Sequence, residues 1–298
     1  MIQKTSSCAL SGSYLNATGK IPFTFTNDYM FRVVPQKRPN VLKGLLSSML
    51  HLAPEDIVSI VIENPIMLGE SVKDKGFVLD IKVTLNNKIV IDLEMQVINE
   101  ANWPVRSLSY LCRNFDNLHR GDKYLDTKPA IHIGFLDFQP FDDNLEFNAT
   151  YKLLNVKNQH LYSDNFTLNV VDLTHINLAT DEDKAFRIDH WARLFKATTW
   201  EEIKMIAENN EYMSEALQTL YECNEDELIR EQCLAREAEI GLKNYYKRSI
   251  KERDEKLAEQ DVLLAEKDTL LIEKDNLLTE KDAEIARLRA QLAAQKKA

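Results

Sequence analysis

Glycine and cysteine are scarce in this sequence, and their scarcity excludes several kinds of site. The 298 residues include 8 glycines, and they form neither a Gly-rich phosphate-binding loop nor a Gly-x-Ser-x-Gly motif. The 4 cysteines form no Cys-x-x-Cys pair, and the 6 histidines are scattered. Zinc and a disulfide framework are therefore not expected, and the thiols are expected to be reduced in a cytoplasmic protein.

Long apolar runs are also missing. Because no stretch of 18 apolar residues occurs, we expect no membrane span, and the first residues lack the apolar core of a signal peptide. The net charge is −10, from 37 basic and 47 acidic residues. Such a balance disfavours phosphate-rich partners unless cations gather locally. The candidates for a local basic surface are Lys37, Arg38, Lys43, Arg106, Arg113, Arg120 and Lys123.

Two neighbouring runs, 77–84 and 88–97, alternate between apolar and polar side chains. Alternation over this length is typical of strands with one apolar face. Asp80 and Lys82 lie on the polar face of the first run. On the second run the polar face consists of Asp92, Glu94 and Gln96, and the apolar face of Ile91, Leu93, Met95 and Val97. Carboxylates of both strands are thus expected on one side of a hairpin.

The turn decides whether these faces match. A two-residue turn at Asn86-Asn87 would set Asp80 opposite Leu93 and mix the faces. A three-residue turn, 86–88, sets Asp80 opposite Glu94 and Lys82 opposite Asp92. Asn tolerates the left-handed conformation that such turns need, so we predict the three-residue turn.

Two carboxylates facing each other across a hairpin lie about 5 Å apart at Cβ. They repel unless one is protonated or a cation lies between them. Hard oxygen ligands suit Mg²⁺ or Mn²⁺. The competing interpretation is an ordinary solvent-facing strand surface, on which Lys82 and Asp92 form a weak ion pair.

Asp80, thirteen intervening residues and Glu94-Met95-Gln96 resemble the PD-(D/E)xK nuclease family transposases, also called recombination-promoting nucleases. The resemblance covers roughly residues 23–200. It includes segments 26–32, where Arg32 replaces a Lys, 106–110, 121–124 and 128–138. It implies a restriction-endonuclease-like αβββαβ core with a mixed sheet, and the composition of the chain after this region adds a C-terminal helical, coiled-coil-like extension. The implied activity is Mg²⁺-dependent (or Mn²⁺-dependent) endonucleolytic hydrolysis of DNA.

The resemblance also implies roles for individual residues. Asp80 and Glu94 would hold the metal, with the carbonyl of Met95 as a third ligand. Gln96 occupies the position of the superfamily's catalytic Lys, and Gln cannot carry charge or abstract a proton. Lys82 could supply the missing charge or pair with Asp92, and Tyr110 would lie beside the site.

A helix is expected over about 104–120. Arg106, Tyr110 and Arg113 would share one face, opposite Leu108, Leu111, Phe115 and Leu118. This polar face could contact DNA through Arg106 and Arg113, or it could be solvated. Further strands are expected at 57–62, 130–138, 151–154 and 166–173, the last of them half exposed at a sheet edge. Residues 28–51 and the region after 181 are expected to be helical.

The sequence changes character after residue 200. We expect four parts: a flexible lead-in (1–22), a nuclease-like domain (23–200), a helical segment (201–250) and a coiled-coil-like tail (251–298). Apolar residues recur every seven positions in the tail, at Leu257, Leu264, Leu271, Leu278, Ile285 and Leu292. A strict period of seven predicts a coiled coil and hence a homodimer. Lysines at the seam, at 267, 274 and 281, favour the alternative of a single solvated helix.

Three functions are compatible with these patterns. The first is a metal-dependent DNA endonuclease. The second is a nuclease-fold protein that binds nucleic acid or a partner without cutting, which the acidity and Gln96 favour. The third is an oligomeric scaffold that acts through its tail.

Overall fold

The computed structural model describes residues 13–65, 80–118 and 120–295. The chain forms two compact units, Met1–Ala238 and Glu239–Ala298. Phe77, Val78 and Leu79, with which the first site strand was predicted to begin, lie outside the described residues, as does most of the expected lead-in.

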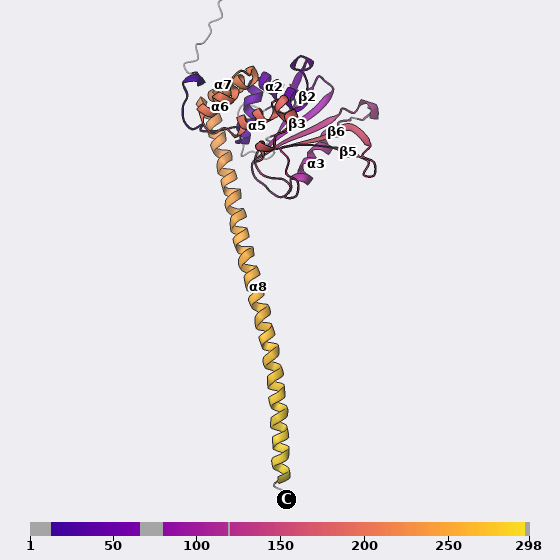
Figure 1. Ribbon diagram of the computed structural model, residues 1–298, viewed down its shortest axis with the longest axis vertical. Helices are drawn as coiled ribbons and strands as arrows, with labels where there is room; N and C mark the ends of the chain where they lie inside the picture. The colour runs from indigo at the N-terminus through magenta and orange to yellow at the C-terminus, as the bar shows by residue number, and fades with distance from the viewer. Residues whose placement is uncertain (1–12, 66–79, 119, 296–298) are drawn as a thin grey trace, which may run out of the picture. The chain divides into compact units, whose positions relative to one another are not determined.

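A six-stranded mixed sheet forms the centre of the first unit (Figure 1). Its strands are β1 (Ile60–Ile62), β2 (Ile81–Leu85), β3 (Ile89–Gln96), β4 (Ala130–Leu136), β5 (Asn148–Leu154) and β6 (Leu161–Asp172). The spatial order is β1-β2-β3-β4-β6-β5. β3, β4 and β6 run parallel, and the other neighbours are antiparallel. With helices before β1 and between β3 and β4, the predicted αβββαβ core and its C-terminal helical extension are confirmed.

The prediction that 166–173 lies at a sheet edge is wrong. β6 begins earlier, at Leu161, and lies between β4 and β5, so β5 forms the edge. The long β6 pairs parallel with β4 on one side and antiparallel with β5 on the other. The alternation at 166–170 reflects the two faces of a strand and carries no information on whether a neighbouring strand pairs on each side.

The register of the β2–β3 hairpin is the one predicted. Lys82 pairs with Asp92 and Leu85 with Ile89, and the amide of Lys88 donates to the carbonyl of Leu85 at 2.9 Å. Asn86 and Asn87 have φ of 50° and 55°. Because Asn tolerates this left-handed region better than most residues, the turn keeps three residues and the two polar faces coincide.

Helices cover the apolar face of the sheet. α1 (Asp28–Lys37) contacts β3 directly. α2 (Pro39–Met49) and α7 (Glu211–Glu225) pack against α1, and α5 (Ile188–Lys196) packs against α2. α4 (Asp181–Ala185) and α6 (Trp200–Ala207) complete this layer. Phe195 of α5 lies between Phe31 of α1 and Phe135 of β4, with ring centres 5.4 and 5.2 Å away. Such an aromatic cluster buries much apolar surface and fixes the sheet against the helices.

The polar face of the sheet is covered by α3 (Trp103–Phe115), which contacts β3, β4 and β6. α3 approaches closely because β4 carries Gly134, where an added Cβ would lie 2.2 Å from the Trp103 ring. The helix ends at Phe115, earlier than predicted. Leu108, predicted on its buried face, is 47% exposed, whereas Ser107 and Asn114 are buried. The face that α3 buries is partly polar because the strand surface beneath it is polar.

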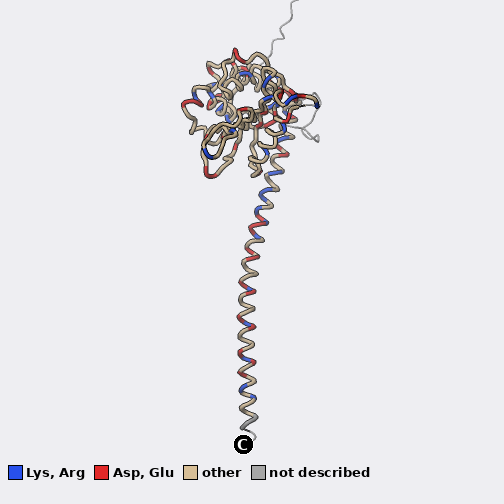
Figure 2. The backbone as a smooth tube through the Cα atoms, turned by 90° about the vertical axis from the view of Figure 1, so that its right-hand side faces the viewer, with Lys and Arg blue, Asp and Glu red and all other residues tan. Residues whose placement is uncertain are grey.

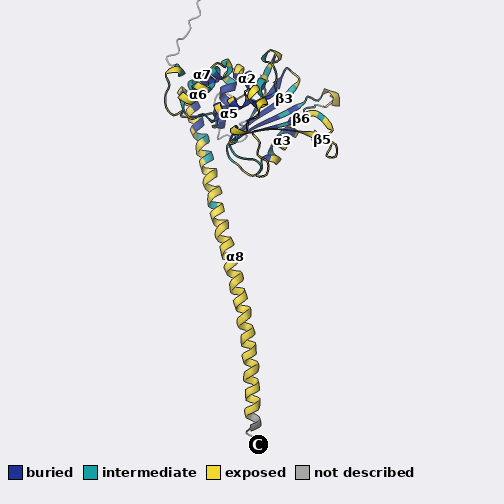
Figure 3. Ribbon diagram, viewed as in Figure 1, coloured by how far each residue is buried: buried dark blue, intermediate teal, exposed yellow. Residues whose placement is uncertain are grey.

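The last helix, α8 (Glu227–Gln295), belongs to both units. Its first turns are anchored in the first unit, where Ile229 and Cys233 are buried and Arg236 binds Asp28 at 2.6 Å. Charged residues of both signs follow one another along the rest of the helix (Figure 2). Every residue from Lys251 to Leu292 is exposed (Figure 3). No helix of the described part of the chain is long and apolar enough to cross a membrane.

The heptad leucines of the tail therefore have no cover within one chain, and their pairing with a second copy stays a prediction. We expect the full chain to sediment as a dimer and a 1–250 truncation to sediment as a monomer, because only the truncation lacks the heptads. Ending at 250 preserves the anchored turns of α8. Equal masses in sedimentation equilibrium would contradict pairing through the tail.

Candidate active site

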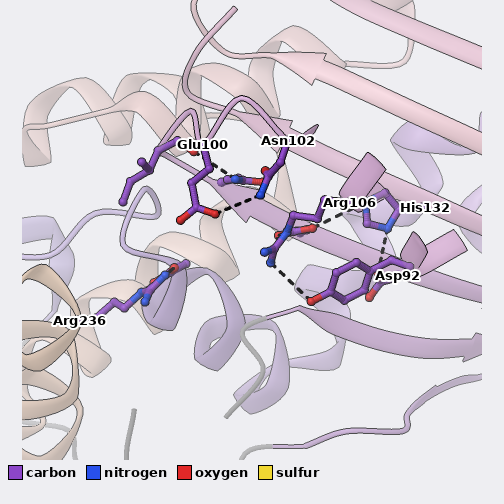
Figure 4. Close-up of polar contacts among 11 residues, drawn as sticks. Asp92, Glu100, Asn102, Arg106, His132 and Arg236 are labelled. Carbon is purple, nitrogen blue, oxygen red and sulfur yellow. Dashed lines mark hydrogen bonds and ion pairs between the residues drawn. The ribbon is translucent and has the colours of Figure 1, made fainter. Parts of the chain in front are cut away.

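Four polar side chains lie buried between the sheet and α3. Asp92, Glu94 and Gln96 project from β3, and His132 projects from β4. The parallel register sets Asp92 beside His132 and Glu94 beside Gly134, so all of them face α3. Figure 4 shows Asp92, His132 and Arg106 gathered on this side of the strands. Buried acidic groups are costly unless they are paired or protonated.

Asp80 joins this group from the residue just before β2. Ile81 pairs with Leu93 in the antiparallel register, so the next residues along the two strands, Asp80 and Glu94, lie opposite each other. The carboxyl group of Asp80 also hydrogen-bonds that of Asp92, which requires a proton on one of them. Burial raises the pKa of Asp80 to about 7, and this hydrogen bond and the charge of Asp92 act in the same direction. Burial likewise raises the pKa of Asp92 to about 6.

His132 is the residue of this cluster that the sequence analysis did not identify. Its Nδ1 lies 2.8 Å from Oδ2 of Asp92, and its Nε2 lies 3.8 Å from Oε2 of Glu94. Burial lowers the pKa of His132 to about 4, against the opposing effect of Glu94 and Asp80, so the imidazole is neutral near pH 7. The alternation of Ile131, Ile133 and Phe135 along β4 is the signal that could have placed His132 on the polar face.

Arg106 of α3 binds Glu94 rather than pointing to solvent. Its Nε and Nη2 lie 2.8 and 2.7 Å from Oε1 of Glu94. Its Nη2 also donates to the hydroxyl of Tyr110 at 3.5 Å. Burial raises the pKa of Tyr110, with the charge of Arg106 opposing the rise. Arg113 is exposed, and its guanidinium carbon lies 5.7 Å from the Tyr110 ring centre. Tyr110 thus lies beside the carboxylates. Of Arg106 and Arg113, only Arg106 forms an ion pair with a carboxylate of the cluster.

The other predicted site residues are distributed as follows. Nε2 of Gln96 donates to the carbonyl of Ile98 at 3.1 Å, while its buried Oε1 has no hydrogen-bond partner. Nζ of Lys82 pairs with Glu63 at 3.1 Å and not with Asp92. The side chain of Met95 is buried in the apolar core, so only its backbone carbonyl is available to a ligand on the polar side.

A family model described as PD-(D/E)XK nuclease family transposase matches residues 25–249. The chain belongs to this family. The resemblance inferred from Asp80 and the Glu94-Met95-Gln96 triplet is thereby confirmed, and the matched region extends past residue 200 into α8. Comparison with curated proteins and with solved structures gave no match.

In this family member, Asp80 is held in place by an asparagine at the end of β1. Asn64 donates to the backbone carbonyl of Asp80 at 3.1 Å and accepts from the amide of Lys82 at 2.8 Å. The guanidinium of Arg32 in turn donates to the carbonyl of Asn64. The positive charge of Arg32 also opposes the rise in the pKa of Asp80. A side chain thus replaces the strand pairing that would otherwise fix the backbone around Asp80.

PD-(D/E)XK nucleases generally use divalent metals, and the donor atoms present here fit such an ion. Oδ1 of Asp80 and Oε2 of Glu94 are buried without hydrogen-bond partners, and both are hard oxygen ligands. No group of three or more His, Cys, Asp or Glu residues in the described ranges is arranged to hold a metal. A cation held by two carboxylates would need carbonyl and water oxygens as well, and Mg²⁺ usually keeps several waters.

The shared proton predicts how stability depends on pH without metal. Between about pH 4 and 7 the folded protein keeps a proton on Asp80 that the unfolded chain releases. The contribution of Asp80 to stability is therefore full below about pH 4 and falls toward pH 7, by about 1.4 kcal/mol per pH unit. The contribution of Asp92 falls in the same direction up to about pH 6, whereas that of His132 rises between about pH 4 and 6.5. Urea unfolding in EDTA measures this dependence. Asp80→Asn should remove the contribution of Asp80 from this dependence, and equal slopes between pH 4 and 7 in wild type and the variant would contradict a proton held by Asp80.

Removing the Asn64 side chain should impair metal binding as well as stability. Asn64→Ala deletes two hydrogen bonds around Asp80, which costs about 1–3 kcal/mol. The variant is expected to need more Mg²⁺ than wild type for the same rise in melting temperature. Asn86→Gly is the matched control, because Asn86 makes three comparable bonds, to Val58, Ser59 and Asp56, at the turn. Equal Mg²⁺ requirements in the two variants would show that Asn64 acts on stability alone.

Proposed function

We propose that this protein is a metal-dependent DNA endonuclease that hydrolyses phosphodiester bonds. The observation that carries the proposal is the buried acidic cluster of Asp80, Asp92 and Glu94, with unpaired oxygens on the polar face of a PD-(D/E)XK sheet. Burying like charges is costly for a purely structural protein. The cost is understandable if a cation occupies the cluster during function.

Asp80 and Glu94 would hold Mg²⁺ or Mn²⁺, with the carbonyl of Met95 as a third ligand. When bound, such an ion polarises the scissile phosphate and lowers the pKa of an attacking water. Arg106 binds one oxygen of Glu94, Oε1, and leaves the other oxygen, Oε2, without a hydrogen-bond partner. That division orients the carboxylate of Glu94.

The remaining residues take supporting roles. Gln96 cannot abstract a proton, but its unpaired Oε1 can accept a hydrogen bond from a water and orient it. The Tyr110 hydroxyl lies beside the cluster and can donate to a phosphate oxygen. Lys82 is paired with Glu63, so supplying charge to the reaction would require it to leave that partner. DNA breaks made in this way would promote recombination.

One observation favours a second function, binding of nucleic acid or a partner without cutting. The unit that contains the site carries the whole net charge of −10, and no lysine occupies position 96. A protein of this kind would keep the fold and the acidic cluster but show no turnover with any divalent metal.

Nicking of supercoiled plasmid tests the proposal. Wild type should nick with Mg²⁺ or Mn²⁺ and not with EDTA. Asp80→Ala and Glu94→Ala should lower the rate at least about 100-fold, equivalent to about 2.7 kcal/mol of transition-state stabilisation. Asp164→Ala is the control, because Asp164 is an exposed carboxylate on β6. Circular dichroism confirms folding of each variant.

Each outcome assigns the function. Metal-dependent nicking that either site variant loses supports the endonuclease. Nicking that survives in both variants would remove the catalytic role from this cluster. DNA binding by wild type without nicking under any metal would favour the binding protein instead.

A further inference from the structure

Basic residues are unevenly distributed between the two units. Residues 239–298 contain 13 basic and 13 acidic residues, so the net charge of −10 lies in residues 1–238. Within the second unit, residues 242–253 contain 5 basic residues and 1 acidic residue. We refer to residues 242–253 as the basic segment. Its positive charges are visible along α8 in Figure 2.

Three cations of the first unit that the sequence analysis proposed for a basic surface pair with its own carboxylates. Lys37 pairs with Asp226 at 3.6 Å, and Arg38 contacts Glu222 at 3.5 Å. Arg106, one of the two DNA-binding candidates on α3, binds Glu94. The Arg106–Glu94 pair is partly buried, which limits the use of Arg106 as a phosphate ligand, whereas the exposed pairs of Lys37 and Arg38 are weak.

The basic segment presents its charges on one side of the helix. Lys243, Lys247 and Lys251 are four residues apart and therefore share a face, with a rise of about 6 Å between successive lysines. Tyr246 and Ile250, each 56% exposed, lie three residues after Lys243 and Lys247 and so border this face. Lysines alternating with an exposed aromatic ring are a combination that binds phosphates and stacks on bases.

Ion pairs within the helix do not prevent such binding. Lys243 contacts Glu239 at 3.1 Å, and Lys251 contacts Glu255 at 3.8 Å. These pairs are exposed, and exposed pairs contribute at most about 1 kcal/mol. A phosphate group can therefore replace a glutamate at little cost.

We propose that the basic segment binds the phosphate backbone of DNA. The proposal rests on the proposed nuclease function, and it explains how a chain of net charge −10 holds a polyanionic substrate. The segment precedes Leu257, where the heptad pattern begins, so binding DNA and pairing of the tail use different stretches of α8. The family match ends at residue 249 and thus includes Lys243, Lys247 and Arg248.

Binding is measured on the full chain in EDTA, so that no cutting interferes. Fluorescence anisotropy of a labelled 30-base-pair duplex gives the affinity over a series of salt concentrations. Lys247→Glu/Lys251→Glu should weaken binding about tenfold or more at 150 mM salt. It should also lower the slope of log affinity against log salt by about 2, because each lost phosphate contact lowers it by about 0.9.

Arg287→Glu/Arg289→Glu is the matched control, since it makes the same charge change at exposed positions of the same helix. The control should bind like wild type. Equal losses in both variants would reduce the effect to overall charge and overturn the proposal. Wild-type affinity and slope in the Lys247/Lys251 variant, or no binding by wild type, would also overturn it.

The two proposals fail separately. If wild type nicks plasmid but the Lys247/Lys251 variant binds DNA normally, the nuclease stands and the role of the basic segment is lost. If no nicking occurs with any metal but the variant loses DNA binding, the basic segment stands and the catalytic proposal is lost.

Discussion

The enforced closeness of like charges is the constraint on which this structure depends. Asp80, Asp92 and Glu94 are brought to one face of two adjacent strands, where Asp92 and Glu94 are buried beneath α3 and Asp80 is half-buried. Without compensation, such a cluster would oppose folding. The structure compensates with a proton shared between Asp80 and Asp92, with Arg106 on Glu94, and with the raised pKa values that burial produces.

The surrounding elements follow from this constraint. Gly134 lets α3 approach closely enough for Arg106 to reach Glu94. His132 stays neutral and satisfies one oxygen of Asp92 without adding a second positive charge to the buried layer. On the opposite face, the aromatic contacts of Phe195 hold the sheet in place. The apolar layer thus supports a polar layer in which the negative charges of the carboxylates are compensated only when a proton or a cation is bound.

The sequence predicted what local patterns control. Alternation and the Asn86-Asn87 turn were enough to give the β2–β3 register, and the order of motifs was enough to give the family. The partners of Arg106 and His132 could not be predicted in the same way, because those contacts join α3 and β4 to β3 across long stretches of chain. The edge position of β5 was missed for a similar reason. It depends on which strand β6 pairs with, and the periodicity of β6 does not encode that choice.

The three-residue turn at 86–88 has a consequence for how this site can change over time. Because the side-chain period of a strand is two, losing or gaining one residue in the turn would move Asp92, Glu94 and Gln96 to the apolar side. A single-codon insertion or deletion at the turn would therefore remove both acidic residues of β3 from the polar face at once without replacing either of them. In this protein the length of an exposed turn is as strict a requirement as the identity of the carboxylates.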